Sequence, residues 1–155
     1  MVEIRSYQGP ISDEVLQWMS AVSLSVFGHG SVADYRDCLE GRRDIWVGLA
    51  FDGVEPVGFK VGYRERPRYF ESWRGGVLEK ARRRGIAAAL MEAQHTWALS
   101  KGFLFVSTTT AHDNTGMIML NLRDGFQVVG SFLDRGRHLK LLLQKQIAEP
   151  PESLS

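Results

Sequence analysis

The sequence contains a single cysteine, Cys38, and no apolar stretch near the ~20 residues that a membrane-spanning helix requires. One cysteine excludes an internal disulfide framework and a cysteine-rich zinc site. Neither charge is in excess, because 19 Lys and Arg oppose 18 Asp and Glu for a formal net charge of +1. Nucleic-acid binders and membrane-surface proteins are usually strongly basic, so neither partner is expected.

The N-terminus also lacks the apolar core of a signal peptide, since Glu3 and Arg5 stand where such a core would begin. We therefore expect a cytoplasmic protein. With 155 residues, 44% of them hydrophobic and 24% charged, the chain has the composition of one globular domain. We expect this domain to cover residues 1–147, with 148–155 as a flexible polar tail.

Apolar periodicity and turn residues predict a chain that alternates between strands and helices. The predicted strands cover 2–7, 45–51, 56–63, 69–78, 103–110, 126–133 and 139–143, and the predicted helices cover 15–27 (starting from Ser12-Asp13), 31–39, 85–102 and 114–123. This order predicts an α/β fold, with a mixed β-sheet of about seven strands flanked by about four helices.

The strongest local motif is Arg82-Arg83-Arg84-Gly85-Ile86-Ala87, between a predicted strand and a strongly periodic helix. Such a junction presents free backbone N–H groups and the positive end of a helix dipole, which together bind phosphate. No Gly-Lys-Ser/Thr and no triple-glycine fingerprint is present, so the common nucleotide loops do not fit. A solvated basic loop that caps a helix explains the same residues, as, less well, does a nucleic-acid clamp.

A second motif follows about thirty residues later, with Asn114, Met117 and Asn121 before Gly125-Phe126. Together with Gly76-Val77-Leu78 and Arg82-x-x-Gly85-x-Ala87, it resembles the GNAT family of N-acetyltransferases. The resemblance implies a centrally splayed sheet and transfer of an acetyl group from acetyl-CoA to an amine. It implies acetyl-CoA as co-substrate and no metal.

The resemblance also implies which residues hold the cofactor. Main-chain groups of Gly75, Gly76 and Val77 would bind the pantetheine arm, and glycine within a strand agrees with a close backbone approach. Asn114 would contact the arm near its reactive end. The residues implied for the pyrophosphate are Arg82 at the first motif position, followed by the amides of Arg83, Arg84, Gly85, Ile86, Ala87 and Ala88.

Glu71 stands eleven residues before the first arginine of the motif and matches the strand carboxylate that histone-type members use as general base. If the strand is regular, side-chain alternation puts Glu71 on the same face as Trp73, Gly75 and Val77. A bulge at the glycine pair would reverse that relation. An ordinary strand glutamate paired with an arginine is the alternative.

Many members carry a tyrosine seven residues after the motif asparagine, as general acid for the CoA thiolate. Here that catalytic position holds Asn121. An amide donates a hydrogen bond but has no titrating proton. A water, a nearby residue or solvent then protonates the thiolate, or catalysis depends mainly on proximity. One branch of the family carries a similar Asn-Leu-Lys/Arg-x-Gly-Phe segment.

No motif in the sequence identifies the amine that would accept the acetyl group. Both a small molecule and a protein amine therefore remain open as acceptors. Arg64, Arg66 and Arg68 could attract an anionic acceptor, although a solvated basic edge is favoured. His95 and Cys38 are interpreted as isolated packing residues. A GNAT-like domain that binds acyl-CoA without transferring it is the alternative function. The resemblance also suggests a homodimer formed through the C-terminal strands.

Overall fold

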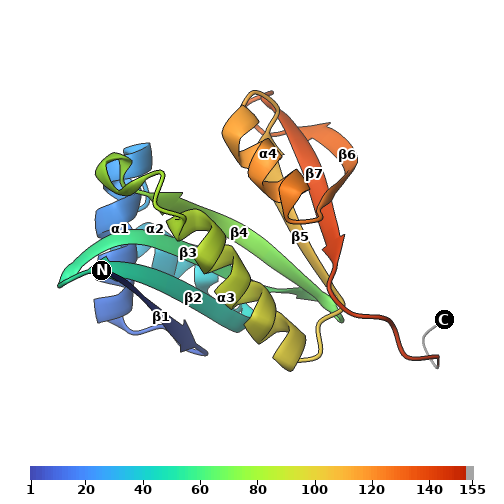
Figure 1. Cartoon of the computed structure of the whole chain (residues 1–155), viewed down its shortest axis with the longest axis horizontal. Helices are drawn as coiled ribbons and strands as arrows, with labels where there is room; N and C mark the ends of the chain where they lie inside the picture. The colour runs from blue at the N-terminus through green and yellow to red at the C-terminus, as the bar shows by residue number, and fades with distance from the viewer. Residues whose placement is uncertain (153–155) are drawn as a thin grey trace.

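The computed structural model describes residues 1–152 (Figure 1). Its elements are β1 (Val2–Gln8), α1 (Asp13–Phe27), α2 (Val32–Leu39), β2 (Arg43–Asp52), β3 (Glu55–Arg66), β4 (Tyr69–Val77), the 3-10 helix η1 (Glu79–Ala81), α3 (Ile86–Ser100), β5 (Phe105–Ala111), α4 (Thr115–Arg123), β6 (Gln127–Leu133) and β7 (Leu139–Gln146). The predicted α/β fold with seven strands and four α-helices is confirmed. The main differences are longer strands β3 and β7 and the short η1, which has no apolar period of its own.

All seven strands form one sheet in the order β1-β2-β3-β4-β5-β7-β6. Only β4 and β5 pair in parallel, and every other neighbour is antiparallel. The parallel pair divides the molecule into two parts, which diverge in Figure 1. We call β1–β4 with α1, α2 and α3 the first wing, and β5–β7 with α4 the second wing.

The helix ends follow from local chemistry. The Ser12 side chain accepts a hydrogen bond from the Val15 N–H and starts α1, which ends at Gly28 with a φ of 76°. At the start of α2, Ser31 and Asp34 form a reciprocal capping box.

Helices cover both faces of the sheet in the first wing, α1 and α2 on one face and α3 on the other. One apolar cluster lies between the sheet and α1 and α2, and includes Met19, Tyr35 and Phe59. Smaller clusters lie on the α3 face, around Ile86 and Leu90 and around Trp46 and Phe70. Both faces of β2 and β3 are therefore buried, which holds these strands in one register.

The interpretation of Cys38 as a buried residue is wrong, because its side chain is exposed. In α2 the residues that face the core are Tyr35 and Leu39, which are one turn apart. Cys38 lies outside this stripe, and its side chain is exposed.

Candidate active site

The parallel seam between β4 and β5 is short. Its paired residues are Tyr69↔Phe105, Phe70↔Val106 and Glu71↔Ser107. Beyond Glu71 the two strands separate, although the Thr108 hydroxyl still donates to the Ser72 carbonyl at 2.9 Å. From there to Val77, β4 has no strand partner on this side among residues 1–152. Its main-chain groups are therefore available to an extended ligand in the splay.

A bulge in β4 decides which way the site residues face. Val61 pairs with Arg74 and Gly62 pairs with Ser72, so Trp73 is the extra residue on β4. The strand is therefore neither regular nor bulged at the glycine pair, the two cases that side-chain alternation left open. The Trp73 indole packs against the core cluster under α1 and α2, with 5.8 Å between its ring centroid and that of Tyr35.

As a result Glu71 and the end of β4 face opposite sides of the sheet. Glu71 lies opposite Tyr63, which belongs to the cluster under α1 and α2. Val77 packs with Ile86 on the α3 face, and the opposition of Gly75 to Lys60 puts that residue on the same face. A regular strand would have put Glu71, Gly75 and Val77 on one face, and the bulge at Trp73 reverses that relation.

The Glu71 carboxyl is partly withdrawn from water. Burial raises its pKa to about 8, and the nearby negative charge of Glu65 acts in the same direction while Arg42 opposes it. Glu71 makes no ion pair with any residue of the described chain. The carboxyl can therefore lose and accept a proton in mildly alkaline solution.

The loop before α3 presents its backbone to the other face. Arg83 and Gly85 both have left-handed φ values, of 63° and 74°. The first backbone hydrogen bond of α3 runs from the Ala89 N–H to the Gly85 carbonyl. The N–H groups of Ile86, Ala87 and Ala88 thus have no acceptor within the helix, and no side chain caps them. Their position at the positive end of the helix dipole suits a diphosphate.

The arginine side chains of this loop are partly engaged by the protein itself. The Arg82 Nε donates to the Val77 carbonyl at 3.2 Å. The Arg84 guanidinium is paired with Asp52 of β2 at 3.1 Å. The backbone of the loop, more than its arginine side chains, is therefore the free anion-binding group.

A hollow of about 190 Å³ lies between this loop, the end of β4 and α4. It is lined by Val77 of β4, by Ala81, Arg82, Arg83, Gly85, Ile86, Ala87 and Ala88, and by Leu120 of α4. The structure thus brings the predicted phosphate-binding residues together with the end of β4 and with the second wing.

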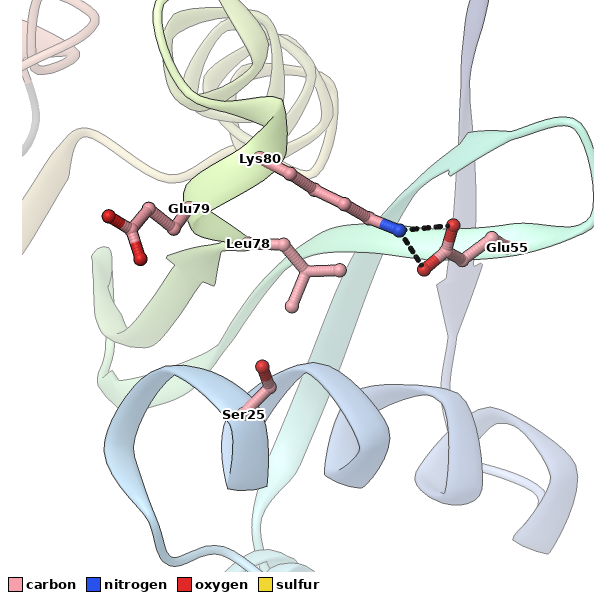
Figure 2. A pocket seen from close by; sticks show the side chains of 5 residues that line it. All are labelled: Ser25, Glu55, Leu78, Glu79 and Lys80. Carbon is pink, nitrogen blue, oxygen red and sulfur yellow. Dashed lines mark hydrogen bonds and ion pairs between the residues drawn. The ribbon is translucent and has the colours of Figure 1, made fainter.

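A second, larger hollow of about 550 Å³ lies beside the end of α1 (Figure 2). Its lining residues are Ser25, Glu55, Leu78, Glu79 and Lys80. The Lys80 ammonium donates to both Glu55 oxygens, at 2.7 and 2.8 Å. Glu79 points away from this pair in Figure 2. No residue predicted for the site lines this hollow.

The two motif asparagines lie at opposite ends of α4. Asn114 is its N-cap, and the Asn114 Oδ1 accepts from the Met117 N–H at 3.2 Å. Asn121 is buried, with 3% of its surface exposed. The Asn114 side chain is therefore already used in part by the helix.

A group of partly buried charges from α3, the end of α4 and β7 was missed by sequence reasoning. Asp124, after α4, accepts from Lys145 of β7 at 3.0 Å and lies 3.3 Å from the Nδ1 of His95. Burial, with the charges of Lys145 and Lys60, lowers the pKa of His95 to about 4. His95 is therefore not an isolated packing residue, as interpreted from the sequence. The apolar neighbours of Lys60 in β3 are the one sequence signal of a lysine turned inward.

The arginines of the β3–β4 turn are occupied by structural contacts. The Arg64 Nε donates to Asp44 at 2.6 Å, the Arg66 guanidinium lies 3.8 Å from the centre of the Tyr69 ring, and Arg68 donates to the Gly102 carbonyl at 3.3 Å.

Within residues 1–152 no group of three or more His, Cys, Asp or Glu side chains is placed to hold a metal ion. None of the helices in this range combines the length and the apolar character that a membrane span needs.

The structure thus combines a divided sheet with a neighbouring loop whose free amides suit a phosphate group. A model of the acetyltransferase (GNAT) family matches residues 12–126. The chain belongs to this family, and family and fold support acetyl transfer in general. A comparison with curated proteins found no match.

Several solved structures share the fold over nearly the whole chain. The ribosomal-protein-S18-alanine N-acetyltransferase of Escherichia coli has a TM-score of 0.84 at 15% identity, with 100% of this chain and 99% of that chain covered. Ard1 of Thermoplasma volcanium gives 0.80 at 19% identity, with 96% and 99% covered. The PaiA N-acetyltransferase of Thermoplasma acidophilum, solved with coenzyme A, gives 0.72 at 16% identity, with 94% and 99% covered.

Proposed function

We propose that this chain is an N-acetyltransferase that moves the acetyl group of acetyl-CoA directly to a primary amine of a small molecule or a protein, in a ternary complex. The observation that carries the proposal is the placement of Glu71 and the amide-lined loop on opposite faces of one divided sheet. A proton acceptor then faces one side of the splay while a diphosphate site faces the other. Cofactor and amine can approach each other through the gap.

The residues on the α3 face fit a CoA molecule. The amides of Arg83 to Ala88 would hold the diphosphate, since those of the first helical turn lack an acceptor within the helix. The pantetheine arm would pair with the main chain of Gly75, Gly76 and Val77, where β4 has left β5. When bound, acetyl-CoA supplies the acetyl group as a thioester.

Glu71 is the proposed general base. It accepts a proton from the attacking amine, directly or through a water, so that the nitrogen lone pair can bond to the acetyl carbon. Because only the ionised carboxylate accepts a proton and its pKa lies at about 8, the transfer rate rises with pH through this region. Trp73, on the same face, contributes an apolar wall that limits water beside the carboxylate.

Asn121 would act only as a hydrogen-bond donor close to the departing sulfur, since its amide carries no titrating proton. Its burial in α4 holds the amide in one position. Proximity of amine and thioester would then provide much of the rate.

The first test is isothermal titration of acetyl-CoA and CoA into the protein, with an assay of CoA release over a panel of amines. Micromolar binding and turnover with one amine would support the proposal. Binding without turnover on the wide panel would favour a domain that binds acyl-CoA without transferring it. An absence of binding would overturn the cofactor assignment.

A matched pair of variants keeps this test specific. Glu71→Gln removes the proposed base and should leave CoA affinity unchanged, because Glu71 faces away from the phosphate loop. Ala88→Asp places a negative charge among the loop amides and should weaken CoA binding without touching the base.

A further inference from the structure

Lys60 of β3 is directed across β4 toward the splay. Its neighbours Phe59 and Val61 pack under α1 and α2, so alternation turns Lys60 to the α3 face. It pairs with Gly75, and a Cβ on Gly75 would lie 3.4 Å from the Lys60 Cγ and 3.0 Å from the Phe59 carbonyl oxygen. The lysine side chain therefore begins beside β4 at the glycine where the proposed pantetheine arm passes.

The ammonium of Lys60 interacts electrostatically with the second wing. The negative charge of Asp124, at the end of α4, acts on the Lys60 ammonium. Asn121 lies three residues before Asp124 in α4, which is close to one helical turn. The ammonium therefore lies within the electrostatic reach of the end of α4, the helix that carries the residue at the usual general-acid position.

The Lys60 ammonium also has no ion-pair partner within residues 1–152. Asp124 is already shared by Lys145 of β7 and His95 of α3, and His95 stays neutral at pH 7 because its pKa is lowered to about 4. Burial lowers the pKa of Lys60 itself to about 8, although Asp124 opposes the shift. Lys60 is half-buried and makes no ion pair within residues 1–152, so its proton is available to a ligand that binds beside β4.

We propose that Lys60 is the proton donor to the departing CoA sulfur, a role that Asn121 cannot fill. The inference rests on the proposed acetyl transfer. The amine nitrogen bonds to the acetyl carbon and loses a proton to Glu71. The C–S bond breaks, its electron pair goes to sulfur, and the Lys60 ammonium gives one proton to that sulfur. The products are the amide and free CoA thiol, and Lys60 and Glu71 then exchange protons with solvent.

The acid strength of the two groups is suited to this step. An ordinary thiol has a pKa of about 8.5, close to the value of about 8 for Lys60. A proton can therefore pass between them with little change in free energy, which is the condition for efficient general-acid catalysis near neutral pH.

Binding of CoA and of desulfo-CoA, in which hydrogen replaces the thiol, tests the position of Lys60 without an acceptor. An ammonium beside the sulfur lowers the thiol pKa by about one unit or more. The affinity ratio of CoA to desulfo-CoA in the wild-type protein should then rise by about threefold between pH 6.5 and pH 8. In Lys60→Met the ratio should not rise over this interval.

Lys60→Arg separates proton transfer from charge. The guanidinium keeps the positive charge but is not deprotonated in proteins. This variant should keep a rise in the ratio with pH, while kcat in the CoA-release assay falls about tenfold or more. A kcat equal to that of the wild type in both Lys60→Arg and Lys60→Met would overturn the assignment.

The possible failures are distinguishable. If both ligands bind the wild-type protein and their ratio does not change with pH, Lys60 is not beside the sulfur and the inference is wrong, while the proposed function stands. If neither ligand binds, the proposed function fails and the inference with it. Thermal unfolding of each variant is the folding control, and Lys60→Met should fold because an unbranched apolar side chain can replace the apolar stem of a half-buried lysine.

Discussion

The two wings of the sheet differ in how they are packed. In the first wing, α1 and α2 cover one face and α3 covers the other, so that β2 and β3 are buried along most of their length. In the second wing, β6 has no buried residue, and it exposes Val129, Phe132 and Leu133. The first wing is therefore a fixed platform, whereas the second is a thinner layer anchored through β5 and β7.

The proposed chemistry follows this difference. Glu71, the β4 backbone and the phosphate loop all belong to the first wing, where packing on two faces holds them in place. The second wing contributes α4, with its two asparagines, and the charges around Asp124. A rigid wing that positions the reacting groups and a lighter wing that closes the other side is a simple way to admit a long cofactor between them.

Glu71→Gln should have the largest effect, because it acts at the seam between the wings. Loss of a general base costs about 10²–10⁴-fold in rate. The measurement is kcat for CoA release against pH, from 6 to 10. The wild-type rate should rise through the pKa of Glu71, at about 8, and the variant should lack this rise. An unchanged rate and pH profile would show that Glu71 is not the base.

The same variant, Glu71→Gln, should lower the rate but raise the stability of the folded protein at alkaline pH. The pKa of Glu71 is raised from 4.5 to about 8 in the folded chain, so the folded state holds a proton that the unfolded state loses. Stability from this group is therefore present below about pH 4.5 and is lost as pH rises to about 8. Glu71→Gln should be more stable than the wild type at pH 8.5, by roughly 2–4 kcal/mol. Urea unfolding at pH 5 and pH 8.5 measures the difference, and equal values at both would contradict it.

Two glycine substitutions compare the packing of the wings directly. A Cβ on Gly62 of β3 would collide with the Glu71 carbonyl and lie 2.5 Å from the buried Phe70 ring. Gly62→Ala should therefore destabilise the protein by about 1–3 kcal/mol. On Gly130 of β6, a Cβ would come no closer than 3.6 Å to Leu142, and Gly130→Ala should stabilise by about 0.5 kcal/mol.

Urea unfolding of both alanine variants provides the measurement, and each variant is the control of the other. Gly62→Ala should also lower transfer activity, because the collision is with the main chain of the proposed base. Equal changes in stability for the two variants would mean that the wings are packed alike.

Ala88→Asp tests whether the first wing binds the diphosphate of CoA at the start of α3. The exposed Ala88 lies in the first turn of α3, where an acid interacts favourably with the helix dipole and should stabilise the fold by about 0.3–1 kcal/mol. The same charge repels a diphosphate and should weaken CoA binding about tenfold or more. Titration of CoA and thermal unfolding should thus change in opposite senses, and the neutral Ala88→Asn is the matched control. Unchanged affinity in Ala88→Asp would place the diphosphate elsewhere.

Val129→Lys should have the smallest effect on folding. Val129 is 56% exposed on the edge strand β6, so the change in free energy of unfolding should lie within about 0.5 kcal/mol. The homodimer suggested by the family resemblance stays a prediction, and light scattering of this variant tests it. A wild-type mass near twice 17.4 kDa that falls to the single-chain mass in the variant would locate the interface on β6.

Much of the fold could be predicted because its signals are local. The capping residues Ser12 and Ser31 mark helix starts, and alternation and turn residues separate the strands. The loop before α3 was also predictable, since the glycine at position 85 and the small residues after it act within a few residues of one another. The splay at the centre of the sheet was expected only from the resemblance to a family, and the order of the strands came from the structure.

The face on which each site residue lies could not be predicted from the sequence. One extra residue at Trp73 turned Glu71 away from Gly75 and Val77, and the position of this bulge is a property of the pairing between β3 and β4. The environments of Lys60 and His95 were hidden for a similar reason, because Asp124 and Lys145 reach them from elements far along the chain.

The amino-acid sequence by itself determined the succession of elements and the loop before α3 that we propose binds phosphate, since each depends on neighbours along the chain. It also placed Asn121 where the family resemblance implies an acid. Only the tertiary structure decided the raised pKa of Glu71 and the opposite orientation of base and loop. It also decided the course of the Lys60 side chain past Gly75. Burial, strand register and the field of distant charges are properties of the packed sheet, and they act between residues that are not adjacent in sequence.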